Sequence, residues 1–168
     1  AGLGFEAGMV DKANRELKNI LGPMAYILSG ARQLVDQQPF QATLQVDGEE
    51  YQVEASAITV ANAAPATSLT AQGFGEVIPD DGLLEVIIAS PKDRMGGLSV
   101  LSSLAWSAIR SSNANNNDLA YFRTKEIKIS LKDNQKLVID GEIIDIESAS
   151  FEVNPGALQV VAPIPLTT

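Results

Sequence analysis

The last quarter of the chain decides its fold: Lys136–Glu142 reads KLVIDGE, and Phe151–Pro163 reads FEVNPGALQVVAP. The first stretch is an apolar strand that runs directly into an acidic Asp-Gly turn. The second contains another apolar strand, with proline near both of its ends, where strands stop because proline cannot donate to the ladder. Together they predict a sheet that holds one carboxylate rigidly at its edge.

The composition fits one domain with an aliphatic core. The chain has 168 residues, of which 45% are hydrophobic and only 5% aromatic, so Val, Ile, Leu and Ala must form the core. The net charge is −9 without a basic run. This excludes the clustered positive face that nucleic acid binding needs, and it disfavours direct attraction to anionic lipid headgroups.

The chain contains no Cys and no His. Thiol chemistry, zinc sites built on these residues and His acid–base catalysis are therefore excluded within it, and the lack of Cys favours a reducing compartment. No apolar run approaches the roughly 20 residues of a membrane span, and no signal peptide is visible. Because the opening Ala1–Phe5 has no initiator Met, we expect a fragment or excised domain of a longer protein.

The amino-terminal residues have helical spacing. Helices are predicted over 6–19 and 24–36, separated by Gly22-Pro23, and a third is predicted over 96–110. The apolar stripe of the second helix, from Met24 to Val35, is typical of core packing. Residues 62–82 and 111–117 are expected to be loops.

The rest of the chain has the period of β-strands, with turns at Asp47-Gly48 and Asp133-Asn134. Leu83–Ala89 is apolar on both faces, so it is expected to be central. The predicted strands are Phe40–Val46, Tyr51–Ala55, Ala57–Ala61, Leu83–Ala89, Ala120–Phe122, Ile127–Leu131, Lys136–Ile139, Ser148–Val153 and Ala157–Ala162. The fold class is therefore α+β: a two-layer antiparallel β-sandwich with N-terminal helices and one inserted helix.

Two acidic turns share the same letters. Asp47-Gly48-Glu49 joins two half-polar strands and is interpreted as a solvated hairpin turn. Asp140-Gly141-Glu142 is either another such turn or a proton acceptor, because it follows an apolar strand that would fix the direction of a carboxylate. The apolar Ile143–Ile146 segment would keep water from one side, which raises a carboxylate pKa.

Pro79–Leu83 places two carboxylates before a glycine. Asp80 and Asp81 are either a solvated turn that leads into the next strand or oxygen ligands for a hard cation. Glycine-rich phosphate loops and serine nucleophile elbows are absent from the sequence, so neither a common nucleotide site nor serine hydrolysis is indicated.

Four motifs, in order along nearly the whole chain, resemble the second domain of soluble lipid kinases of the diacylglycerol kinase and sphingosine kinase superfamily. GLGFEA is similar to "G-x-G-F-D-A", VAN to "V-x-N", PDDGLLEV to "P-x-x-D-G-x-L-D", and DGE with VNPGAL to "D-G-E … V-x-P-x-A-L". These segments are Gly2–Ala7, Val60–Asn62, Pro79–Val86, Asp140–Glu142 and Val153–Leu158. Glu6 and Glu85 stand where the family has Asp.

The resemblance implies a two-domain enzyme with its active site in the cleft between the domains. The first domain binds ATP through "G-G-D-G-T", which is absent here, and the second is a β-sandwich that shapes the lipid pocket. Carried over by motif position, Glu142 is the residue that deprotonates the lipid hydroxyl, with Asp140 as its neighbour. Asn62 would line the cleft, and Asp81 would hold a structural Mg²⁺.

The resemblance therefore implies that residues 1–168 are the acceptor-binding domain of an ATP-dependent lipid kinase that phosphorylates a diacylglycerol-like hydroxyl. ATP with Mg²⁺ would bind mainly on the missing domain, so the chain alone would be inactive. The enzyme is expected to be cytoplasmic and peripheral at the membrane.

Two alternatives remain. One is a non-catalytic ligand-binding or regulatory module, since related domains occur in longer bacterial chains assigned other activities, methylglyoxal synthase among them. The missing His argues against that activity within this chain. The other is a plain structural β-sandwich.

Overall fold

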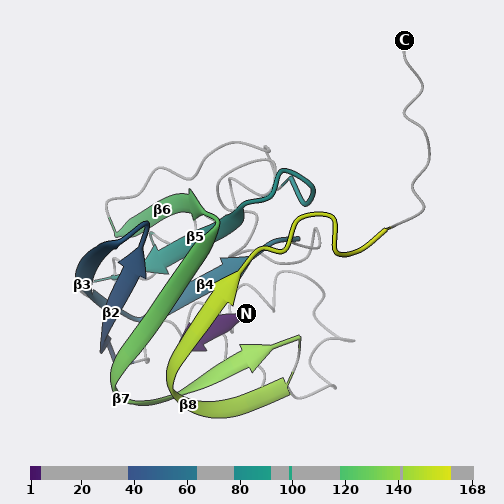
Figure 1. Cartoon of the computed structure of the whole chain (residues 1–168). Coiled ribbons are helices and arrows are strands. Elements are labelled where there is room, and N and C mark those ends of the chain that lie inside the picture. The colour runs from purple at the N-terminus through teal and green to yellow at the C-terminus, as the bar shows by residue number, and fades with distance from the viewer. Residues whose placement is uncertain (5–37, 64–77, 92–98, 100–117, 141, 160–168) are drawn as a thin grey trace.

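The described residues of this computed structural model, 1–4, 38–63, 78–91, 99, 118–140 and 142–159, form a curled antiparallel sheet around an aliphatic core (Figure 1). Its strands are β1 (Gly2–Gly4), β2 (Phe40–Val46), β3 (Glu49–Ala55), β4 (Ala57–Ala61), β5 (Leu84–Ala89), β6 (Leu119–Thr124), β7 (Glu126–Ile139) and β8 (Glu142–Glu152). The spatial order is β3-β2-β7-β1-β4-β5-β6, and β8 pairs with β7. The antiparallel β structure of the predicted sandwich is confirmed, and the α+β class stays a prediction.

The three predicted helices lie outside the described residues, apart from Ser99. The same holds for the 111–117 loop and for most of the 62–82 loop. Within the described ranges, no helix has the length and apolar character of a membrane span.

The β2–β3 hairpin forms as its sequence predicts. The even-numbered residues of β2 are buried and Gln41 and Gln45 are exposed, which is the alternation of a strand with one face on the core. Asp47 has φ 51° and Gly48 has φ 83°, so both central residues of the turn are left-handed. This is the conformation that an Asp-Gly pair favours, because it matches the twist of the flanking strands.

β5 is flanked by a strand on each side, as its mostly apolar sequence predicts. It pairs with β4 on one side and β6 on the other, and all six of its residues are buried. One of the six is charged: the carboxylate of Glu85 lies inside this strand.

β7 corrects one sequence prediction. Instead of two strands joined by a turn at Asp133-Asn134, residues 126–139 form one strand paired with β8 along its length. Ser130 pairs with Ser148 and Gln135 with Ile146, so four residues of β7 stand opposite Glu147 alone. The extra residues form a bulge that bends the hairpin (Figure 1). The turn-forming residues are therefore used for a bend inside one strand.

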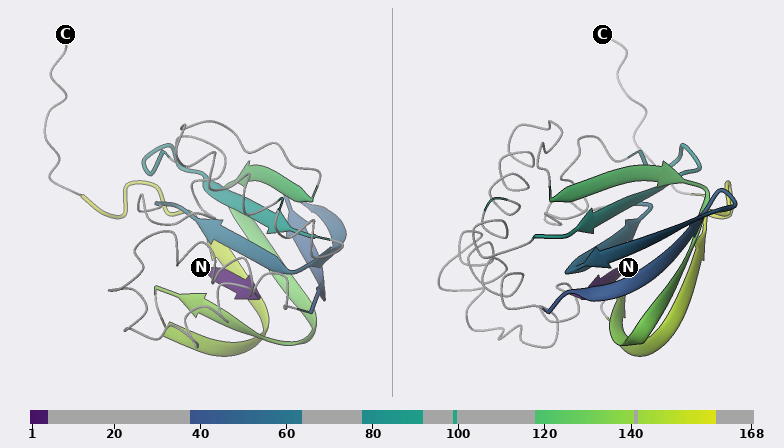
Figure 2. Two further views of the ribbon diagram at one scale, coloured as in Figure 1. Left: turned by 180° about the vertical axis from the view of Figure 1, so that it is seen from behind. Right: turned by 90° about the vertical axis from the view of Figure 1, so that its left-hand side faces the viewer.

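Because of the bend, β7 can pair with strands in both halves of the curled sheet. Residues 128–130 before it, and Leu131 at its start, pair with β2; Leu137 and Val138 after it pair with β1. Figure 2 shows the β7–β8 hairpin passing from the β2 side to the β1 side.

β1 was not predicted as a strand, because three residues with two glycines carry no hydrophobic period. It lies between β4 and β7, and its Leu3 is 1% exposed. Gly4 has φ 72°, and a Cβ atom there would meet the carbonyl oxygen of Ser56 and the ring of Phe40. Only glycine fits this position without strain.

The predicted strand Ala157–Ala162 is wrong in its described part. Residues 157–159 have no strand pairing, and Leu158 is 80% exposed. Pro155 and Gly156, with φ 70° at the glycine, form a turn directly after β8. This turn takes the chain out of the β7–β8 ladder, so residues 157–159 do not continue it.

Gly4→Ala should lower the free energy of unfolding by roughly 3 kcal/mol, because it combines left-handed strain with a clash. Gly48→Ala is the matched control: its φ is similar but nothing lies within 4 Å of the added carbon, so it should cost roughly 1 kcal/mol. Urea denaturation of both variants measures the difference. Equal costs would show that the close approach of Ser56 and Phe40 to Gly4 does not exclude a side chain there.

Candidate functional site

The acidic turn 140–142 and Asn62 lie at the same edge of the sheet, which here means the side on which β4 and β7 both end. Gly2 pairs with both Val138 and Thr59. One step further Ala1 pairs with Val60: the Ala1 nitrogen donates to the Val60 oxygen at 2.7 Å, and the Val60 nitrogen donates to the Ala1 oxygen at 2.9 Å. Asp140 and Asn62 therefore both leave the sheet just beyond this row. Their strands are two positions apart, roughly 10 Å at the usual strand spacing.

Two further motif segments meet at this edge, on the right of Figure 1. Asn62 Nδ2 donates a long hydrogen bond of 3.4 Å to the Pro79 carbonyl, which ties the end of β4 to the segment before β5. A Cβ atom on Gly82 would lie 3.7 Å from Pro155 Cγ, so the turn after β8 packs on the same segment. Three motifs that are far apart in sequence are thus neighbours in space.

The 140–142 turn has a rigid base and a solvated tip. Leu137 and Val138 are buried, and Asp140 is left-handed with φ 49°, as Asp47 is in the other acidic turn. Asp140 and Glu142 are both exposed. Ile144 is 44% exposed as well, so the expectation that Ile143–Ile146 shields the turn from water is corrected. The proton-acceptor role of Glu142 stays a prediction.

A chain of four polar side chains links β5, β6 and the segment before β5. Arg123 pairs through Nη2 with Asp81 Oδ2, and its Nε lies 2.9 Å from Glu85 Oε1. The Tyr121 hydroxyl donates to Glu85 Oε2. Glu85 and Arg123 are direct cross-strand partners, which explains why the guanidinium reaches the buried carboxylate.

Sequence reasoning missed Tyr121, Glu85 and Arg123 as a group. The available signal was Glu85, a single carboxylate inside an otherwise apolar strand, because a buried charge needs a partner. The identity of that partner depends on the β5–β6 register, which the sequence does not specify.

Asp81 is engaged by protein groups at both carboxylate oxygens. The Leu83 N–H donates to Oδ1 at 2.9 Å, and Arg123 pairs with Oδ2. In the part of the chain that the structure describes, no cluster of three or more acidic, His or Cys side chains is present. The donor set at Asp81 therefore does not fit the structural magnesium ion that the sequence resemblance implies.

The pKa of Tyr121 is raised well above its usual range. Burial is the largest cause, followed by the hydrogen bond to Glu85 and the negative charge of that carboxylate. All three oppose formation of a phenolate.

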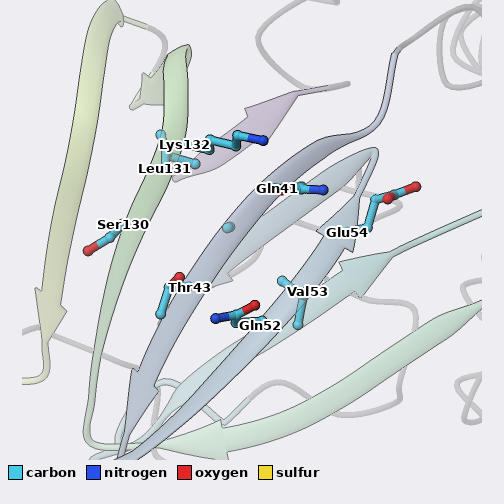
Figure 3. Close-up of a pocket in the computed structure, with 9 residues that line it drawn as sticks. Gln41, Thr43, Gln52, Val53, Glu54, Ser130, Leu131 and Lys132 are labelled. Carbon is cyan, nitrogen blue, oxygen red and sulfur yellow. The ribbon is translucent and has the colours of Figure 1, made fainter.

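An open groove of about 420 Å³ lies across β3, β2 and β7, next to the bend (Figure 3). Its lining mixes amides, hydroxyls, Lys132 and Glu54 with three apolar side chains. None of the predicted site residues lines it, so the groove is separate from the edge described above.

The curled antiparallel sheet defines a domain of the β-sandwich class. Residues 1–162 match the family described as the YegS C-terminal NAD kinase beta sandwich-like domain, and the chain belongs to this family. The resemblance predicted from the four motifs is confirmed.

Proteins of similar sequence agree with this family assignment. An uncharacterized protein of Synechocystis sp. is 44% identical over 98% of this chain and 38% of its own length. The diacylglycerol kinase of Bacillus subtilis is 26% identical over 76% of this chain and 40% of its own length. A "Probable lipid kinase YegS-like" of Pseudomonas aeruginosa is 26% identical over 95% of this chain and 51% of its own length. The chain thus spans about half the length, or less, of these relatives.

Among solved structures, a "putative diacylglycerol kinase" of Bacillus anthracis superposes with a TM-score of 0.66 at 22% identity. The superposition covers 92% of this chain and 49% of the other. At this identity it shows a shared fold.

Replacing Tyr121 with Phe should flatten the loss of stability at alkaline pH. A raised folded-state pKa contributes stability that is complete below about pH 10 and is lost as the pH rises further toward the folded-state value. Urea denaturation between about pH 8 and pH 11 measures this loss. Tyr51→Phe is the control, because Tyr51 bonds Glu49 on an exposed hairpin and should change the profile less. A Tyr121→Phe profile that follows the wild type would contradict the assignment.

Proposed function

We propose that the chain is the acceptor-binding domain of an ATP-dependent lipid kinase that phosphorylates a hydroxyl of a diacylglycerol-like lipid. The observation that carries the proposal is the meeting of three family motifs at one sheet edge, in a chain that belongs to the YegS C-terminal family. ATP and its Mg²⁺ would bind mainly on a nucleotide-binding domain ahead of Ala1. The relatives, about twice as long as the matched segment or longer, support this arrangement.

The position of Ala1 fits this arrangement. Ala1 pairs with Val60 next to the end of β7. A domain that precedes it would therefore join the edge that carries Asn62 and the acidic turn. Closure of two domains over this edge would exclude water from the turn and strengthen its electrostatic interactions.

In the proposed reaction, Glu142 accepts the proton of the lipid hydroxyl as the hydroxyl oxygen bonds the γ-phosphorus and the bond to ADP breaks. Asp140 is the neighbouring carboxylate, and Asn62 lines the cleft. Phosphoryl transfer depends mainly on positioning and charge stabilisation. A positioned base contributes about 10²–10⁴-fold.

The lipid acceptor would be reached by peripheral contact with the cytoplasmic face of a membrane. The charge of −9 opposes attraction to anionic headgroups. β8 carries four acidic and no basic residues, namely Glu142, Asp145, Glu147 and Glu152. Binding would therefore depend on the apolar part of the lipid and on other parts of the protein.

A non-catalytic ligand-binding module in a larger protein is the second candidate. It is favoured by the exposed tip of the acidic turn and by the Synechocystis relative, of which the match covers only 38%. A "G-G-D-G-T" motif encoded ahead of Ala1 discriminates between the two, because it provides the phosphate-binding part of a kinase.

The 168-residue chain alone should transfer no phosphate to lipid. Incubation with radiolabelled ATP, Mg²⁺ and mixed vesicles of diacylglycerol and phosphatidylglycerol, followed by lipid extraction, measures this. The same chain joined to a nucleotide-binding domain is the positive control. Full activity of the isolated chain would refute the division of labour between two domains.

With that domain joined, Glu142→Gln should lower kcat about 10²–10⁴-fold, because the amide cannot accept the proton. Glu49→Gln is the matched control, since it lies in an Asp-Gly-Glu turn with the same left-handed Asp. The variants are compared by steady-state lipid phosphorylation. Unchanged turnover in Glu142→Gln would remove Glu142 from the mechanism.

A further inference from the structure

We propose that Arg123 is the cation that neutralises Asp81, so that a guanidinium rather than a magnesium ion holds the segment 78–83 against the sheet. This inference concerns the stability of the domain and does not depend on the proposed kinase activity. It makes Arg123 a positioning residue for the edge that carries Asn62.

The guanidinium lies between two carboxylates. Arg123 Nη2 contacts Asp81 Oδ2, and Nε lies 2.9 Å from Glu85 Oε1. Asp81 belongs to the segment before β5 and Glu85 to β5 itself, whereas Arg123 comes from β6. One planar, permanently charged group thus joins three parts of the chain, which a guanidinium can do because its donors are fixed in a fork.

Because this ion-pair network is partly buried, a metal ion cannot easily replace Arg123 in it. The Glu85 side chain is 3% exposed, and those of Asp81 and Arg123 are 20% and 32% exposed. A buried carboxylate that loses its partner is strongly destabilising. A metal ion at Asp81 would have to move Arg123 without depriving Glu85 of its positive neighbour.

Magnesium keeps several of its waters in proteins but still needs one or two carboxylate oxygens as ligands. No oxygen of Asp81 or Glu85 is left without a protein group beside it. The oxygens of Asp81 are engaged by Arg123 and the Leu83 N–H. Those of Glu85 face Arg123 and the Tyr121 hydroxyl. A resident positive charge also repels a divalent cation.

The Arg123–Asp81 ion pair also affects the residues on either side of Asp81. Pro79 accepts the hydrogen bond from Asn62, and Gly82 packs beside Pro155. Because Arg123 fixes Asp81 between these two positions, it also fixes how the end of β4 and the turn after β8 meet the segment.

The test is thermal unfolding of the 168-residue chain in magnesium chloride and in EDTA. The wild type should melt at the same temperature in both. Arg123→Ala should lower Tm by roughly 5 °C or more in EDTA. Magnesium should partly restore it, because two carboxylates then lack a cation. Arg123→Lys keeps the charge but loses the forked donors, so its Tm should lie between those of the wild type and Arg123→Ala. This variant also keeps the test possible if Arg123→Ala does not fold.

Lys128→Ala is the matched control, because Lys128 is an exposed cation on β7, five residues further along the chain than Arg123. It should leave Tm within about 1 °C of the wild type. A wild-type Tm that rises with magnesium, together with loss of that rise in Asp81→Asn, would overturn the proposal. An Arg123→Ala Tm equal to that of the control would overturn it too.

Discussion

The bend in the β7–β8 hairpin is the constraint on which the rest of the structure depends. Without the extra residues at 131–134, β7 would run straight and could pair with β2 or with β1, but not with both. The bend turns one flat ladder into a curled sheet whose two halves face each other. Ile127 and Ile129 before it and Leu137 after it then join a single buried cluster. Packing in that cluster stabilises the bend, since a straight strand would expose part of the same apolar surface.

The site edge follows from this curl and from antiparallel pairing. Antiparallel strands bring residues that are distant in sequence to the same end of a sheet, so Asn62, the segment 78–83 and the turn after β8 become neighbours. The edge is held by polar contacts at its surface and by one buried carboxylate. Glu85 is tolerated inside an apolar strand because its partners come from the adjacent strand, at positions fixed by the register. The register of β5 and β6 therefore positions the charged side chains, and their ion pairs in turn hold these strands and the segment 78–83 together.

The sequence predicted those parts of the fold that depend on local pattern. The β2–β3 hairpin, β4 and β5 follow from alternation, an Asp-Gly turn and a run of apolar residues, each visible within a few positions. The bend and β1 could not be predicted in this way: Asp133-Asn134 has the composition of a turn, and Gly2–Gly4 acquires its strand only from neighbours more than fifty residues away. For the site, motif resemblance singled out Asn62 and Asp81, whose functional roles stay predictions. It could not reveal Arg123, whose role is defined by a cross-strand contact, or the solvated tip of the 140–142 turn.

The placement of β1 has a consequence for how the protein is made. β1 leaves the ribosome before every other strand of the sheet, but its two neighbours are β4 and the far half of β7. It can pair with β4 once residues 57–61 have emerged, but its other edge stays unpaired until Leu137 and Val138 have been synthesised, and that pairing closes the longest loop among the described strands. Such non-local pairing slows folding. During this interval the free edge of β1 is open to pairing with other chains, which is the aggregation risk that an unpaired strand edge carries.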